Sequence, residues 1–143
     1  MKNFKIFFTI LLFVIALPGF SQKVKLKNGD VLIDEVVWLK YRDCGNFDKG
    51  CSLLDKNNEE IVYLNWITVS DEELITNGNA RGKLTYVEVK FLKLKKSFEI
   101  QKTQKDIIKM LYNSKVINED LTVNKEKVEL MVEKYGKEFS IRY

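Results

Sequence analysis

The spacing of apolar side chains changes near residue 102, and this change constrains the fold more than any other feature of the sequence. Before it, apolar side chains recur mainly at every second position, as at Val24 and Leu26 or at Val87 and Val89, which indicates strands with one buried face. After it, they recur at intervals of three and four, which indicates amphipathic helices. A run of strands followed by helices predicts an α+β fold, in which two C-terminal helices pack on one face of an antiparallel sheet.

Turn residues divide the first part of the chain into about five to seven strands. Asn28-Gly29 predicts a tight hairpin turn, because both residues tolerate positive φ. Ser70 and Glu73 have the spacing of a capping box, which predicts a short helical turn after the longest strand. The expected strands cover residues 24–26, 31–33, 36–41, 52–55, 60–69, 84–94 with a bulge near residue 91, and 98–101.

Each expected C-terminal helix has a start signal, Thr103 for the first and Asn124 for the second. Gly136 is expected to end the second helix in a left-handed conformation. Helices of about 11 or 12 residues are marginal alone, so we expect both to pack on the sheet face made by Val87, Val89 and Phe91. Their apolar stripes are Ile107, Ile108, Leu111 and Tyr112, and then Val128, Met131, Val132 and Tyr135.

Residues 1–21 have the layout of a secretory signal peptide. A lysine-containing start and an apolar run from Ile6 to Leu17 precede Gly19 and Ser21, which are small residues at the positions that signal peptidase reads. Such a run spans about 18 Å as a helix and is shorter than the ~30 Å hydrocarbon core, so cleavage is expected rather than anchoring. No cysteine lies directly after the run, where a lipid would be attached. We therefore expect one mature domain, residues 22–143, with no transmembrane segment, in the periplasm or outside the cell.

The two cysteines, Cys44 and Cys51, lie in a polar segment. Oxidising conditions outside the cytoplasm favour a disulfide between them. The alternatives are free thiols, a redox pair, and a metal site that also uses Asp43 and Asp48. Redox motifs usually place two residues between the cysteines, and two thiolates without histidine make a poor zinc site. We expect a structural disulfide, with no metal and no cofactor.

The chain contains no histidine, so it lacks the commonest general base and the commonest metal ligand in proteins. Residues 78–83 contain two glycines and a lysine, but the glycines lack the spacing of a phosphate-binding loop. No serine or threonine follows Lys83, as such a loop would require. Consecutive carboxylates at Asp71, Glu72 and Glu73 do not converge across a cleft, as acid and base catalysis requires. We expect a protein that is not an enzyme and has no catalytic residue.

Large aromatic side chains on the expected strands are candidate ligand contacts. They either belong to the core or form an exposed row that stacks on sugar rings or on a protein partner. Phe47 and Asp48, between the cysteines, would suit the tip of a loop that enters a partner's cleft. The strand candidates are Trp38, Tyr41, Trp66 and Tyr86.

Charge is unevenly distributed along the mature chain. Residues 30–80 contain eleven acids and four bases, whereas residues 81–105 contain eight bases and two acids. Opposite charges of this kind are typical of solvated surfaces that attract each other. Lysines interleaved with aromatics would also suit single-stranded nucleic acid, but export argues against that partner, and we expect none.

Several segments together carry a resemblance. The leader end Gly19–Gln22, the hairpin Lys27–Val31, the loop Asp43–Leu53 and the stretch Glu133–Ser140 resemble small secreted proteins of Bacteroidota that have no defined activity. The resemblance implies no activity for any residue. We expect a noncatalytic exported protein that binds another envelope or extracellular protein, or a glycan. The alternative is an inhibitor or immunity protein that inserts its 44–51 loop into an enzyme.

Overall fold

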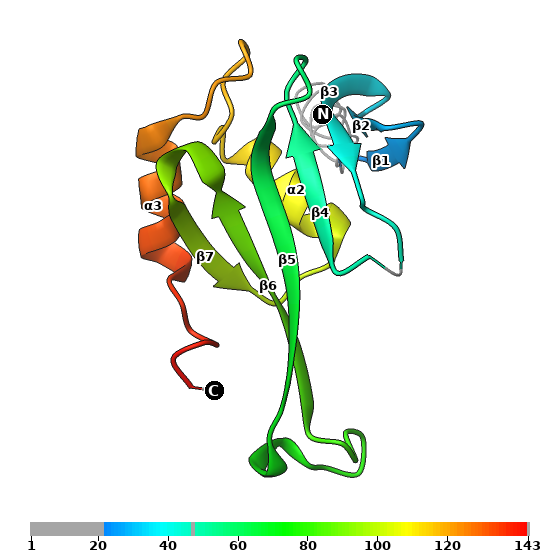
Figure 1. Ribbon diagram of the computed structural model, residues 1–143, viewed down its shortest axis with the longest axis vertical. Coiled ribbons are helices and arrows are strands. Elements are labelled where there is room, and N and C mark those ends of the chain that lie inside the picture. The colour runs from blue at the N-terminus through cyan, green and yellow to red at the C-terminus, as the bar shows by residue number, and fades with distance from the viewer. Residues whose placement is uncertain (1–21, 47, 143) are drawn as a thin grey trace, which may run out of the picture.

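A seven-stranded antiparallel sheet forms the centre of the computed structural model, which describes residues 22–46 and 48–142 (Figure 1). Each strand pairs with the next one along the chain, so the sheet is a meander. This arrangement confirms the predicted α+β class. The strands are β1 (Val24–Lys27), β2 (Asp30–Ile33), β3 (Val36–Arg42), β4 (Gly50–Leu54), β5 (Glu60–Ser70), β6 (Lys83–Phe91) and β7 (Lys96–Ile100).

Two helices follow the sheet, α2 (Gln104–Asn113) and α3 (Lys125–Tyr135). Both begin where the sequence predicted: the Thr103 side chain accepts a hydrogen bond from the Asp106 backbone N–H, and the Asn124 side chain accepts one from the Lys127 N–H. In Figure 1, α3 runs beside β7, while α2 lies behind β4 and β5 in this view. α3 packs chiefly on β7, and α2 reaches β1 at the other edge of the sheet.

The sheet face predicted to receive the helices is buried, because Val87, Val89 and Phe91 are each at most 1% exposed. Aromatic rings extend this packing toward α3, with ring centroids 6.2 Å apart between Phe91 and Phe98 and 5.2 Å apart between Phe98 and Tyr135. The helix residues in the same core are Ile107, Ile108, Leu111, Val128 and Met131.

The predicted capping box differs from the observed turn at the end of β5. The strand continues through Ser70, and the Asp71 carboxylate accepts the hydrogen bond from the Glu73 N–H at 2.8 Å. One 3₁₀ turn, η1 (Glu72–Leu74), follows. Aspartate caps as well as serine does, so the start signal was correct in kind and wrong by one residue.

The predicted strand over 84–94 is also too long. β6 ends at Phe91, and Leu92–Leu94 forms a 3₁₀ turn, η2, that Lys95 ends with a φ of 51°. The change in apolar parity there marks the end of a strand and not a bulge. Gly136 ends α3 at a φ of 59°, as a glycine permits, but its ψ of −149° lies outside the left-handed helical region.

The segment after α3 crosses the edge of β7 to the sheet face opposite the helices, an arrangement that the sequence did not indicate. The Glu99 backbone N–H donates to the Gly136 carbonyl at 2.9 Å. The buried Glu99 carboxylate then accepts hydrogen bonds from the N–H groups of Phe139 at 2.9 Å and Ser140 at 2.8 Å. The Tyr86 ring stacks on Phe139 with centroids 5.1 Å apart. These contacts fasten the C-terminal segment to β6 and β7.

The predicted signal peptide, residues 1–21, lies outside the described residues. Within the part of the chain that is described, none of the helices has the length and hydropathy needed to cross a bilayer.

Candidate functional site

A disulfide joins Cys44 and Cys51, with Cα atoms 4.3 Å apart, as the sequence predicted. Cys51 lies on β4 opposite Leu64 of β5, and its side chain is fully buried on the helix side of the sheet. Cys44 follows the end of β3 and is half-buried. The bridge therefore ties the loop between β3 and β4 to the helix side of the sheet.

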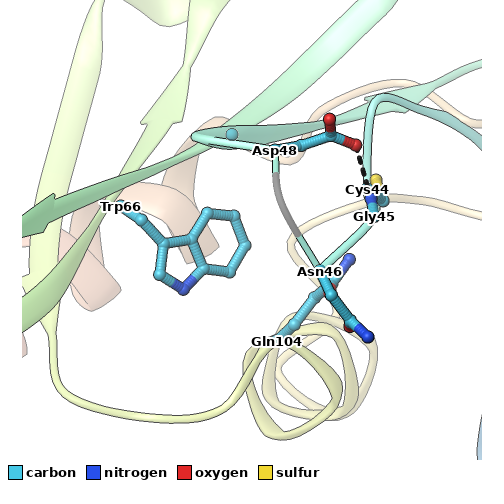
Figure 2. Close-up of a pocket in the computed structure, with 7 residues that line it drawn as sticks. Cys44, Gly45, Asn46, Asp48, Trp66 and Gln104 are labelled. Carbon is cyan, nitrogen blue, oxygen red and sulfur yellow. Dashed lines mark hydrogen bonds between the residues drawn. The ribbon is translucent and has the colours of Figure 1, made fainter.

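A cavity of about 210 Å³ opens beside this loop. Figure 2 shows the Trp66 indole on one side of the opening and the loop on the other, with Gln104 near the loop. The lining residues are Cys44, Gly45, Asn46, Asp48, Gly50, Trp66 and Gln104.

Trp66 is half-buried because it lies just beyond the first residue of β4. The residue pairs with Val87 of β6, so its side chain lies on the helix side of the sheet. β4 begins at Gly50, opposite Asn65, and beyond that point the neighbouring chain is the loop, whose Lys49 carbonyl accepts a hydrogen bond from the Trp66 N–H at 3.0 Å. The cavity lies between the indole and this loop.

The loop folds back on itself around Asp48. One carboxylate oxygen, Oδ2, accepts a hydrogen bond from the Gly45 N–H at 2.6 Å, drawn as a dashed line in Figure 2. A Cβ at position 45 would lie 2.9 Å from that oxygen, so a glycine permits the close approach. The other carboxylate oxygen, Oδ1, has no hydrogen bond to another described residue.

Gly50 serves a similar steric purpose on the strand. Its backbone lies under the ring of Tyr63, and a Cβ at this position would collide with the phenol. Tyr63 is diagonal to Gly50 across β4 and β5, since its direct partner is Ser52. An aromatic ring that covers a strand glycine in this way supplies the packing that the glycine, which has no side chain, cannot provide.

Gln104 brings α2 into the site. It is the first residue of the helix, and its Nε2 donates to the Cys51 Sγ at 3.1 Å. This contact orients the amide, and its Oε1 bonds to no other described residue. Asn46, exposed on the loop, likewise has an amide without a hydrogen bond to the described residues. Sequence reasoning identified neither residue, because the meeting of a loop with a helix start 53 positions later has no local signal.

A second cavity, of about 410 Å³, surrounds Trp38 at the other end of α2. Val37 pairs with Leu32 and Leu39 pairs with Val31, which leaves Trp38 as the extra residue of a β-bulge. A bulge redirects a side chain, and the Trp38 ring meets the edge of Tyr112 with centroids 5.2 Å apart at 86°. The other lining residues are Lys115, Ile117, Asn118, Glu119 and Leu121.

Of the six predicted contact residues, Asp48 and Trp66 line one cavity and Trp38 lines another. Tyr41 lies opposite Leu53 and packs against the core. Tyr86 is 4% exposed under Phe139 and belongs to neither lining. Phe47 lies outside the described residues. The predicted residues that the structure describes are therefore divided among four places in the molecule.

Among the residues described, no group of three or more His, Cys, Asp or Glu side chains is close enough to hold a metal ion. Comparison with protein-family models, with curated proteins and with solved structures gives no match.

Proposed function

We propose that this chain is an exported, noncatalytic binding protein of the cell envelope, and that it takes its ligand in the cavity between the disulfide loop and Trp66. The observation that carries the proposal is the half-buried indole, which packs against the core and also borders an opening. An aromatic face beside a few fixed polar groups is the usual composition of a binding pocket.

The disulfide supports both parts of the proposal. A bridge between Cys44 and Cys51 is stable in an oxidising compartment, which agrees with the leader. It also holds the loop in place before any ligand arrives, so binding has less loop entropy to overcome.

A capture experiment tests the binding site. The protein recovered after export is immobilised and exposed to an envelope extract that contains both proteins and glycans. We expect a component that is retained by the wild-type protein and by a Trp38→Phe variant but not by Trp66→Ala. Equal retention by Trp66→Ala, or loss with Trp38→Phe alone, would contradict the proposed site.

Export is tested on the same preparation. The intact mass of the protein from the periplasm or the medium should correspond to a chain that begins at Gln22. A recovered species that still contains residues 1–21 would overturn the predicted cleavage.

Inhibition of an enzyme is a second candidate function. It is favoured by the disulfide between Cys44 and Cys51, which holds their Cα atoms 4.3 Å apart and closes the loop between them. A rigid loop suits insertion into a cleft. However, the Asp48 carboxylate bends back to Gly45 and does not point outward as an acidic plug would. In the capture experiment this candidate predicts a retained enzyme whose activity falls when the protein is added.

A further inference from the structure

We propose that the Trp66 cavity binds a single uncharged sugar ring, such as one hexose unit of an envelope glycan. This inference rests on the proposed function and names the ligand of the same site. It follows from the size of the cavity, the charge of its lining and the hydrogen-bonding groups that remain free there.

The size limits the ligand to one ring or one side chain. At about 210 Å³, the cavity is smaller than the pockets of roughly 300 Å³ or more that enclose drug-sized ligands. One ring can place its face on the Trp66 indole, while the rest of a polymer remains outside. Because the ends of a glycan chain project from such a site, the cavity does not need to be larger.

The lining excludes an anionic ligand. The described residues of the lining include no lysine and no arginine, and their one charged side chain is the Asp48 carboxylate. A phosphate, sulfate or carboxylate would therefore find no cation there and would be repelled by Asp48.

The free polar groups match hydroxyl groups, which both donate and accept hydrogen bonds. Asp48 Oδ1 and Gln104 Oε1 are acceptors without a partner among the described residues, because Oδ2 is bonded to Gly45 and Nε2 to Cys51. The Asn46 amide offers two donors and an acceptor. The lining thus combines an aromatic ring for the apolar face of a sugar with carboxylate and amide groups for its hydroxyls.

An organic ammonium group is the competing ligand, since tryptophan and carboxylate groups also attract cations. The site suits it less well. Among the described residues of the lining, Trp66 is the one aromatic side chain, so these residues offer a cation a single ring face instead of a cage, and one Asp48 oxygen is already bonded to Gly45. The two amides, moreover, add hydrogen-bonding groups that a quaternary ammonium cannot use.

Fluorescence titration provides the test. The chain has two tryptophans, so a Trp38→Phe variant reports Trp66 alone. We titrate it with methyl glycosides of glucose, galactose, mannose and N-acetylglucosamine and with their oligosaccharides, and separately with choline and with inorganic phosphate. We expect a saturable change with at least one neutral sugar and none with choline or phosphate.

Matched variants link that change to the cavity. In the Trp38→Phe background, Asp48→Ala should weaken sugar binding at least tenfold. Asp43→Asn removes the charge of an exposed neighbour outside the lining and suits its φ of 54°, so it should leave sugar binding unchanged. Calorimetry should show no sugar binding by Trp66→Ala and weakened binding by Trp66→Phe, with near-ultraviolet circular dichroism confirming that both are folded.

Binding of choline in place of sugars, or no response to any sugar, would overturn this inference. If envelope capture still depends on Trp66 in that case, the proposed function stands with a different ligand. If capture is also independent of Trp66, both proposals fail.

Discussion

At the scale of single residues, the buried carboxylate of Glu99 is the most consequential feature that local pattern did not reveal. It accepts hydrogen bonds from the N–H groups of Phe139 and Ser140 and is 4% exposed. In the sequence it is one acid on an alternating strand, where solvent exposure is the ordinary expectation. Its role depends on a segment 40 positions later along the chain.

We expect Glu99→Ala to lower the free energy of unfolding by about 1 to 3 kcal/mol, because it leaves two backbone donors without an acceptor. Glu99→Gln retains an acceptor oxygen and should lose less. Urea denaturation of these variants gives the measurement, with Glu133→Ala, an exposed acid of α3, as the control. If Glu99→Ala and Glu133→Ala have equal stability, the carboxylate does not hold the C-terminal segment.

Tyr86 gives a pH-dependent prediction for the same region. Burial raises the pKa of its phenol above the ordinary 10.0, and the nearby charges of Glu99 and Glu88 raise it further. The unfolded chain therefore loses this proton at lower pH than the folded chain does. The resulting stability is fully present below pH 10.0 and is lost as the pH rises through the raised pKa of the folded state.

Urea denaturation at a series of alkaline pH values should thus show a steeper loss of stability in the wild-type protein than in Tyr86→Phe. Lysine titration affects both proteins and cancels in the comparison. Parallel curves would mean that Tyr86 ionises in the folded state as it does in the unfolded chain.

At the scale of elements, much of the fold could be predicted because its signals are local. Period-two patterns located the seven strands, Asn28-Gly29 adopts positive φ at both residues, and Thr103 and Asn124 cap the two helices. The errors lay at the ends of elements, as at Ser70 and beyond Phe91, where one residue type can either continue a strand or begin a turn.

The candidate site was less predictable for a physical reason. Its residues come from a loop, from β5 and from the start of α2, and they meet because β4 begins only at Gly50, so that the loop before it lies beside Trp66. Whether a strand aromatic is core or ligand contact depends on what lies across from it. For Trp66 and Tyr86 the outcome differs, since Phe139 covers one ring and a cavity adjoins the other.

Helix packing yields an element-scale prediction. Leu111 of α2 is fully buried, whereas Leu130 of α3 is 52% exposed. Leu111→Ala should lower the free energy of unfolding by about 2 to 5 kcal/mol through lost burial and the resulting cavity. Leu130→Ala makes the same chemical change at the surface and should alter it by less than about 0.5 kcal/mol. Chemical denaturation of both variants compares them, and similar losses would contradict the observed packing of α2.

At the scale of the whole molecule, an ion pair connects the acidic segment, residues 30–80, with the basic segment, residues 81–105. It joins Glu59 to Lys93 of η2, whose charged atoms are 2.8 Å apart. Their hydrogen bond and mutual attraction raise the pKa of Lys93. Both side chains are more than half exposed, so salt and water screen the pair, and its contribution to stability is small. Burial of apolar surface by α2 and α3, and not charge, is therefore expected to hold the sheet and the C-terminal third together.

The two outer strands of the sheet are protected differently. β1 carries Lys25 and Lys27, and charged side chains on an edge strand discourage pairing with another molecule. β7 is protected by α3 and by the bond from Glu99 to the Gly136 carbonyl. The C-terminal third thus covers both an apolar sheet face and a strand edge.

A chain truncated after Gln101 should therefore aggregate, because it exposes Val87, Val89 and Phe91 together with the free edge of β7. A chain that ends at Lys137 is the matched control: it retains α2, α3 and the Gly136 carbonyl but loses the backbone donors to Glu99, so it should stay monomeric with a lower melting temperature. Size-exclusion chromatography and thermal melts of the two proteins provide the readout. If the shorter chain is monomeric and melts like the full-length protein, the helices do not stabilise the sheet, and the single packed core described above is wrong.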